Sequence, residues 1–140
     1  MSRLGRRLAF DYGDVRIGVA VCDPDGILAT PLEFLSTKDP SLKSSILALC
    51  SEYEPAKIYV GLPLNLSGEE SEATKKAIAF SDLLTHRASC PVKLVDERLT
   101  TSSASASLSQ AGVNAKDQRK KIDSQSAVII LESGLAQDRE

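Results

Sequence analysis

The sequence predicts one α/β domain, residues 1–140, built on a five-stranded mixed sheet with helices on its faces. Two patterns predict it: three short apolar runs joined by turn residues come first, and helical and strand patterns then alternate. The first pattern is typical of antiparallel strands and the second of parallel ones. With 140 residues, 42% of them hydrophobic and 26% charged, the chain suits a single domain with its own core.

The first three elements are predicted strands. Gly13 and Asp14 form a turn between the first two, and Asp-Pro-Asp-Gly at 23–26 is a strong turn signal before the third. Pro31 cannot donate a backbone hydrogen bond, so the third strand is expected at an edge of the sheet. The three predicted strands cover residues 8–13, 16–22 and 27–35.

The hydrophobic period then changes to that of a helix. Leu42, Ile46 and Leu49 share a helical stripe, and Gly112 is a typical helix stop. The predicted helices cover residues 41–53, 69–87, 100–111 and 122–135, the remaining strands cover 57–61 and 92–95, and loops cover 63–68 and 114–121. We expect the last few residues to fray.

Composition and charge limit the classes of function. No apolar stretch approaches the ~20 residues of a membrane span, and the basic N-terminus is not a secretory signal because the apolar run after it breaks at Asp11. The net charge of −2 neither indicates nor excludes a nucleic-acid partner. No Ser-His or Cys-His nucleophile and no phosphate-binding loop is indicated, and His86 is expected on the surface.

The cysteines indicate a compartment. Their number is odd and their spacing matches no zinc motif. Reduced structural thiols in a cytoplasmic protein are therefore expected, and a disulfide stays an alternative. The three are Cys22, Cys50 and Cys90.

Three acidic positions stand out against the predicted elements. Asp11 lies inside an apolar strand, where a carboxylate is costly unless it is paired, protonated or bound to a metal; the alternative is a turn-forming Asp. Asp96 and Glu97 follow a strand at the end where ligands bind in α/β sheets, or else form a helix cap with Arg98 in a salt bridge. Asp123 begins the apolar stripe of the last helix, or only stabilises the helix dipole.

Together the three acids predict a metal site. If the first and fifth strands are close, Asp11 and Glu97 meet near one edge, and the final helix brings Asp123 over it. Clustered carboxylates raise one another's pKa unless a cation lies among them, and Mg²⁺ and Mn²⁺ prefer such oxygen ligands. Two such ions about 4 Å apart activate water and stabilise the leaving oxygen in phosphodiester cleavage. Asp96 is a poor fourth ligand, since its side chain should face opposite to that of Glu97.

Four blocks of the sequence resemble the YqgF family, also called RuvX, of the ribonuclease-H-like superfamily. They occur in the family's order and spacing over almost the whole chain, and read DYGDVRIGVA at 11–20, VGLP at 60–63 followed by Gly68, DERLTT at 96–101 and KIDSQSAVIIL at 121–131. Two departures are visible. Ser126 stands where the family often has the first of two alanines, which we expect to be tolerated. Asp14 and Val15 replace a small-basic pair, which removes one cation near the substrate.

The resemblance implies a metal-dependent nuclease with a ribonuclease-H-like fold, in which Asp11, Glu97 and Asp123 are the catalytic and metal-binding residues. It implies Mg²⁺ or Mn²⁺ as cofactor and a role in processing the 5′ end of the precursor of small-subunit ribosomal RNA. Branched DNA is the rival substrate, because the family was first described by analogy with junction resolvases. The chain would act as a monomer or a homodimer, and two symmetric cuts at a junction need the dimer.

Two readings from other classes stay open. A non-catalytic nucleic-acid-binding module would keep the fold without cleavage, since only three acids are placed where many superfamily sites carry four. An actin-like nucleotide-binding fragment would use Asp-Tyr-Gly at 11–13 on a phosphate, although the chain is too short for the two domains of such ATPases.

Further residues of the blocks are expected near the cleft. The cleft-lining candidates are Gly13, Gly61, Pro63 and Thr100; as alternatives, Gly13 serves only the turn and Thr100 caps a helix. The basic candidates are expected to position phosphates without reading sequence, and are Arg16, Arg98, Lys116, Arg119, Lys120 and Lys121. Arg16 and Arg98 could instead neutralise a neighbouring carboxylate. Arg3, Arg6 and Arg7 either add to this basic patch or belong to a disordered tail.

Overall fold

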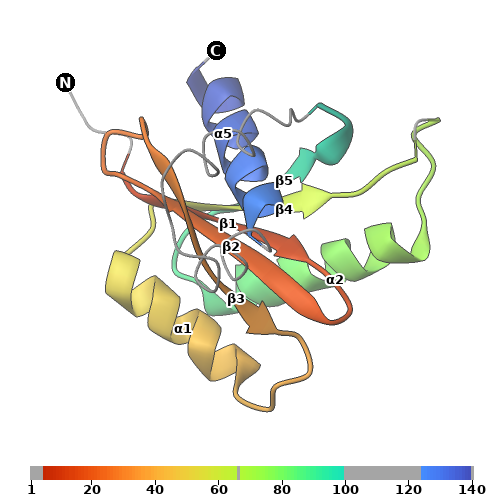
Figure 1. Ribbon diagram of the computed structural model, residues 1–140, viewed down its shortest axis with the longest axis horizontal. Helices are drawn as coiled ribbons and strands as arrows, with labels where there is room; N and C mark the ends of the chain where they lie inside the picture. The colour runs from red at the N-terminus through yellow and green to blue at the C-terminus, as the bar shows by residue number, and fades with distance from the viewer. Residues whose placement is uncertain (1–4, 66, 100–123, 140) are drawn as a thin grey trace, which may run out of the picture.

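The computed structural model describes residues 5–65, 67–99 and 124–139, and its strands form one mixed sheet in the order β3-β2-β1-β4-β5 (Figure 1). The strands are β1 (Arg7–Tyr12), β2 (Arg16–Cys22), β3 (Ala29–Ser36), β4 (Lys57–Leu62) and β5 (Val92–Asp96). The first three pair antiparallel, whereas β4 pairs parallel with both β1 and β5. The predicted five-stranded mixed sheet is therefore confirmed, with β3 at an edge.

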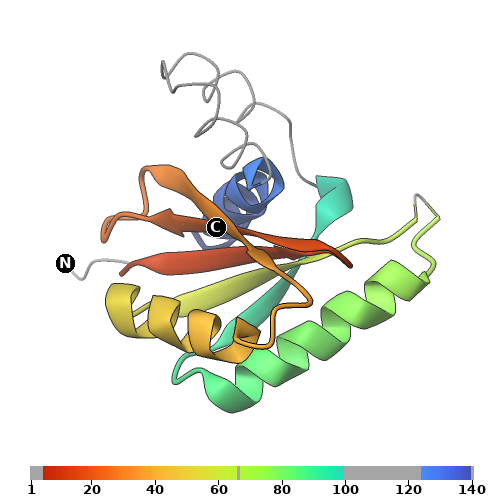
Figure 2. The same ribbon diagram turned by 60° about the horizontal axis from the view of Figure 1, so that its bottom comes forward.

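Helices cover both faces of the sheet. Figure 2 shows α1 (Leu42–Tyr53) and α2 (Glu72–Arg87) on one face and α5 (Gln125–Arg139) on the other. A short 3-10 helix, Glu97–Leu99, follows β5 directly. None of the described helices combines the length and the hydropathy that a membrane span needs.

The alternation of side chains divides the core in two. Leu8 and Phe10 of β1 pack with the residues beneath α1 and α2, while Ala9 packs with the residues beneath α5. Gly134 lets α5 approach the sheet closely, because a Cβ there would lie 2.7 Å from the ring of Tyr59. Asp11 lies two residues beyond Ala9 in β1, so its side chain is on the same face of the sheet, the face that α5 covers.

Side-chain hydrogen bonds move two predicted element boundaries. The prediction that the second helix begins at residue 69 is wrong: α2 begins at Glu72, because Ser71 and Thr74 form a reciprocal capping box. The third strand begins at Ala29 rather than residue 27, because the Asp23 carboxylate accepts the amides of the two intervening residues at 2.7 Å and extends the turn. The predicted helix at 100–111 and loop at 114–121 lie outside the described residues.

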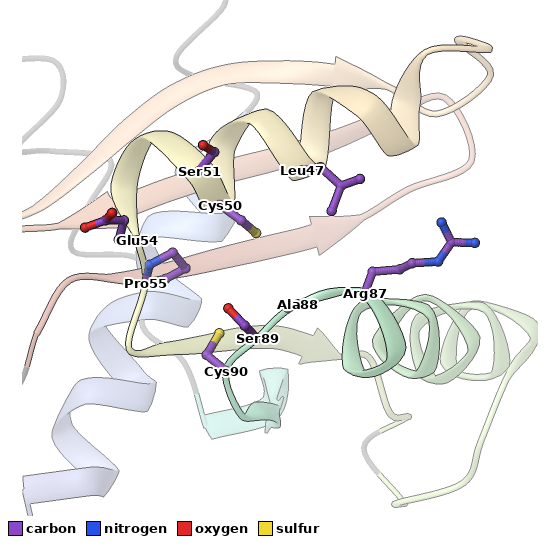
Figure 3. A pocket seen from close by; sticks show the side chains of 9 residues that line it. All are labelled: Leu47, Cys50, Ser51, Glu54, Pro55, Arg87, Ala88, Ser89 and Cys90. Atoms are coloured by element: carbon purple, nitrogen blue, oxygen red, sulfur yellow. The ribbon is translucent and has the colours of Figure 1, made fainter.

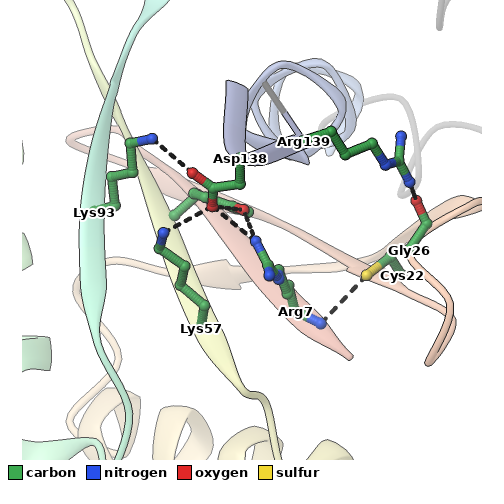
Figure 4. A network of polar contacts seen from close by, with 8 residues as sticks. Arg7, Cys22, Gly26, Lys57, Lys93, Asp138 and Arg139 are labelled. Carbon is green, nitrogen blue, oxygen red and sulfur yellow. Dashed lines mark hydrogen bonds and ion pairs between the residues drawn. The ribbon is translucent and has the colours of Figure 1, made fainter. Parts of the chain in front are cut away.

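The C-terminal end of α5 is held by a half-buried carboxylate rather than frayed (Figure 4). Asp138 accepts hydrogen bonds from Arg7 and Lys57 at 2.7 Å, Lys93 at 2.8 Å and the Tyr59 hydroxyl at 2.6 Å. Burial alone would raise the pKa of Asp138, but the bonds from Lys57, Lys93 and Tyr59 outweigh it and hold this pKa well below its usual range. The predicted helix end at residue 135 is thus wrong, and α5 continues to Arg139.

Arg7 belongs to this network around Asp138, at the end of β1 opposite to Asp11. It begins β1, four residues before Asp11, and its side chain is only 10% exposed. The expectation that Arg7 joins a basic patch or a disordered tail is therefore wrong, because its partner Asp138 lies 131 positions further along the chain. Arg6 is exposed, and Arg3 lies outside the described residues.

Candidate active site

Asp11 and Glu97 lie on the same face and at the same end of the sheet, on either side of β4. Asp11 is one step beyond the parallel pair Phe10–Val60, and Glu97 follows the last pair of β4 with β5. Both side chains are half-buried. Between them lies Gly61, where a Cβ would come within 3.1 Å of the carboxyl carbon and Oε2 of Glu97 and would overlap Cδ1 of Ile130. The missing side chain of Gly61 therefore leaves the space that the Glu97 carboxylate occupies.

The start of α5 is fastened above this pair by two serines. Ser124 is fully buried; its hydroxyl accepts from the Val19 amide at 3.0 Å and donates to the Leu32 carbonyl at 2.7 Å. The Ser126 hydroxyl hydrogen-bonds the Asp11 carboxylate. The sequence indicated only that Ser126 would be tolerated, whereas the structure gives it a contact with Asp11 that an alanine cannot make.

Burial and mutual repulsion disfavour the charged forms of the two acids. Burial raises the pKa of Asp11, and the bond from Ser126 opposes part of this rise. The pKa of Glu97 is raised to about 7, first by burial and then by the charges of Asp11 and Asp96. Two half-buried carboxylates that repel each other fit a hard divalent cation, which would remove this electrostatic cost.

Two of the predicted metal ligands, Asp11 and Glu97, lie in the described part of the chain. Within residues 5–65, 67–99 and 124–139, no group of three His, Cys, Asp or Glu side chains gathers around a possible ion. Asp123, the third predicted ligand, lies outside the described residues, directly before Ser124. Asp96 is engaged elsewhere, since its carboxylate accepts Nη2 of Arg98 at 2.7 Å and Nε at 3.1 Å, and the Arg98 bonds lower its pKa.

Arg98 thus takes the alternative that the sequence left open, a cation paired with a neighbouring carboxylate. Its Nη1 lies 3.4 Å from the place of a Cβ on Gly68, so it also reaches the loop after β4. Pro63 in that loop is held by α2, because its carbonyl accepts the hydroxyl of Thr74. Both residues border the end of the sheet that carries the two acids, and a phosphate contact by Arg98 stays a prediction.

The tip of the β1–β2 hairpin has its own polar contacts. Gly13 allows a tight turn, since a Cβ there would lie 2.6 Å from the Arg16 carbonyl oxygen. Asp14, the acid that departs from the family pattern, accepts Lys76 of α2 at 2.8 Å. Lys76 thus neutralises the negative charge of Asp14 at the tip of the hairpin. Arg16 is exposed and stacks on Phe34, with 5.1 Å between the guanidinium carbon and the ring centroid.

The remaining predicted site residues lie outside the described parts of the chain. They are Thr100, Lys116, Arg119, Lys120 and Lys121. His86 is exposed, as predicted.

A separate pocket of about 470 Å³ lies between α1 and the segment that follows α2 (Figure 3). Cys50 and Cys90 both line it, on the side of the sheet opposite the two acids. All three cysteines are free thiols, which agrees with the expectation of reduced cysteines. No residue of the predicted site lines this pocket.

Comparison with known proteins places the chain in a family. The family model RuvX, described as Holliday junction resolvase, matches residues 5–137. A protein of Streptomyces coelicolor is 50% identical over 98% of this chain and 83% of its own length, and one of Mycobacterium ulcerans is 50% identical over 96% and 81%. Both carry the name "Putative pre-16S rRNA nuclease".

Solved structures show the same fold at low sequence identity. RuvC of T. thermophilus in complex with a Holliday junction substrate aligns with a TM-score of 0.63 at 15% identity, covering 96% of each chain. A second Thermus thermophilus RuvC structure aligns with a TM-score of 0.55 at the same identity and coverage. The chain therefore belongs to the RuvX family, a family of phosphodiester-cleaving enzymes with a ribonuclease-H-like fold.

Proposed function

We propose that this chain is a divalent-cation-dependent nuclease that cleaves a precursor of small-subunit ribosomal RNA at its 5′ end, with Asp11, Glu97 and Asp123 as its catalytic acids. One observation carries the proposal. The Asp11 and Glu97 carboxylates share one face and one end of the sheet, across Gly61, and each has a raised pKa. Such a pair is costly to the fold and has a ready use in holding a cation.

Asp11 and Glu97 would hold Mg²⁺ or Mn²⁺ together with Asp123. When bound, these ions supply an activated water and charge stabilisation at the leaving oxygen of a phosphodiester. Ser126 orients the Asp11 carboxylate, and Gly61 leaves Glu97 its place over β4. Arg16 and Arg98 border this end of the sheet and would position phosphates.

The choice of RNA rests on the relatives. Those at about half identity are named for pre-16S rRNA, and an enzyme acting on such a substrate would work in the cytoplasm. The family description favours a second candidate, resolution of a four-way DNA junction. Because that reaction needs two symmetric cuts, it needs a dimer, and a strict monomer on a sizing column argues against it.

A cleavage assay tests the proposed function. The purified chain is mixed with Mn²⁺ and an end-labelled single-stranded RNA that carries the 5′ precursor sequence, and the assay is repeated with Asp11→Asn. Asp82→Asn is the matched control, because Asp82 is an exposed acid of α2. We expect cleavage by the wild type and the control and none by Asp11→Asn. Cleavage that persists in Asp11→Asn, or binding without cleavage by the wild type, contradicts the proposal.

A further inference from the structure

We propose that Phe34 and Arg16 form a stacking platform for an unpaired nucleobase on the Asp11 side of the two acids. This inference rests on the proposed nuclease function and deepens it, since it names single-stranded nucleic acid as the form of substrate that the site accepts.

The platform is a planar cation lying over an aromatic ring. The guanidinium carbon of Arg16 is 5.1 Å from the ring centroid of Phe34, within the range of a cation–π contact. Arg16 is exposed and Phe34 is half-buried. Both groups present flat surfaces, and stacking on an aromatic ring or a guanidinium plane is a common way for proteins to hold unpaired bases.

The strand register places this pair beside Asp11. Asp11 pairs with Gly18 across β1 and β2, so their side-chain positions share a face. Arg16 lies two residues from Gly18 and therefore begins β2 on that same face. Since β1 and β3 are two strand spacings apart, Phe34 lies on the order of 10 Å across the sheet from Asp11, whereas β5, which Glu97 follows, is two strands further away. A strand with its phosphate at the acids would carry a neighbouring base over this pair.

A bulge in β3 is aligned with the site. Ile17 pairs with Leu35, but Val19 pairs with Leu32, so two residues of β3, Glu33 and Phe34, stand opposite Gly18 alone. Bulges of this kind redirect side chains and are frequent next to active sites. The amide of Val19 and the carbonyl of Leu32 at this bulge bond the buried Ser124 hydroxyl, which fixes the irregular backbone. The two hydrogen bonds of Ser124 thus hold the bulge, and with it the backbone beside Phe34, in place.

Binding without cleavage tests the platform. In EDTA, which withholds the cations, we would measure by fluorescence anisotropy the affinity of the full chain for a labelled single-stranded RNA 10-mer and for a fully abasic 10-mer of equal charge. Phe34→Leu keeps apolar volume without the π face, and Arg16→Lys keeps charge without the plane. Tyr53→Leu is the matched control, because Tyr53 is a half-buried aromatic at the end of α1.

The wild type and Tyr53→Leu should bind the base-bearing strand about tenfold more tightly than the abasic one. This preference should fall severalfold in both Phe34→Leu and Arg16→Lys, while binding of the abasic strand by Phe34→Leu stays unchanged. An equal preference in all four proteins overturns the platform. If the wild type cleaves RNA with Mn²⁺, that failure leaves the proposed nuclease intact. Absence of any RNA binding by the wild type in EDTA overturns the platform, and the proposed nuclease is overturned as well only if cleavage with Mn²⁺ is also absent.

Discussion

Replacement of Gly61 by alanine should lower activity by displacing the Glu97 carboxylate, in addition to the stability that it costs through overpacking. The new Cβ would lie 3.1 Å from the carboxyl carbon and Oε2 of Glu97 and would overlap Cδ1 of Ile130, whose side chain is 1% exposed. Overpacking of this kind costs about 1–3 kcal/mol of unfolding free energy. Because the Glu97 carboxylate must also shift, we expect kcat/KM for RNA cleavage to fall about 100-fold, the usual effect of misplacing a reacting group by about 1 Å.

Gly134→Ala is the matched control for this substitution. Its Cβ would lie 2.7 Å from two atoms of the Tyr59 ring and 2.8 Å from a third, so it too should destabilise the fold. The Tyr59 hydroxyl donates a hydrogen bond to Asp138 at the end of α5 that lies away from Glu97, so this substitution should not move the Glu97 carboxylate. Chemical denaturation gives the two unfolding free energies, and Mn²⁺-dependent cleavage under folding conditions gives the two activities. Equal loss of stability with equal loss of activity in both variants would refute a specific role for Gly61.

Three further outcomes follow from the same contacts. Asp138→Asn should lower the unfolding free energy by about 3 kcal/mol, because it leaves the 10%-exposed Arg7 without its carboxylate. Since the folded pKa of Asp138 is depressed, this difference in unfolding free energy between the wild type and the variant should be full above a pH of about 4 and should shrink as the pH falls further. Urea denaturation at several pH values would measure it. The folded pKa of Glu97 is raised to about 7, so the metal-free chain should lose stability as pH rises from about 4.5 to 7, and Mn²⁺ affinity should rise over the same window. In calorimetric titrations Glu97→Gln should weaken both dependences and leave only the part that comes from the raised pKa of Asp11. Ser124→Ala should cost about 2–3 kcal/mol, since it leaves the Val19 amide and Leu32 carbonyl without their side-chain partner, and hydrogen exchange at Val19 should quicken before that of β4.

Much of the fold and the position of two site residues could be predicted from local patterns. The period of two in β1 placed Asp11 on the face opposite Leu8 and Phe10, and Glu97 was placed at the end of its strand; both placements agree with the structure. The predicted stripe of α5 is buried at Ala127, Ile130, Leu131 and Gly134. These features depend on neighbours within a few residues, which is why the sequence alone indicates them.

The features that were missed depend on partners far apart in sequence or on irregular backbone. Arg7 looked like part of a basic tail, because nothing near it in sequence indicates its pairing with Asp138. Neither the helical nor the strand period of hydrophobic residues predicts that Arg16 stacks on Phe34, because the contact arises at a bulge that adds one residue to β3. Ser126 read as a tolerated change, and only the packing of α5 over β1 shows that its hydroxyl meets Asp11.

The central claim, that Asp11 and Glu97 hold a divalent cation together, is tested most directly by Mn²⁺ binding without nucleic acid. Electron paramagnetic resonance of free Mn²⁺ at pH 8 would be titrated against the wild type, Asp11→Asn, Glu97→Gln and the Asp82→Asn control. We predict that the first two variants each bind Mn²⁺ at least about tenfold more weakly than the wild type and the control, since each removes one oxygen donor. Equal Mn²⁺ affinity in all four proteins would contradict the shared site.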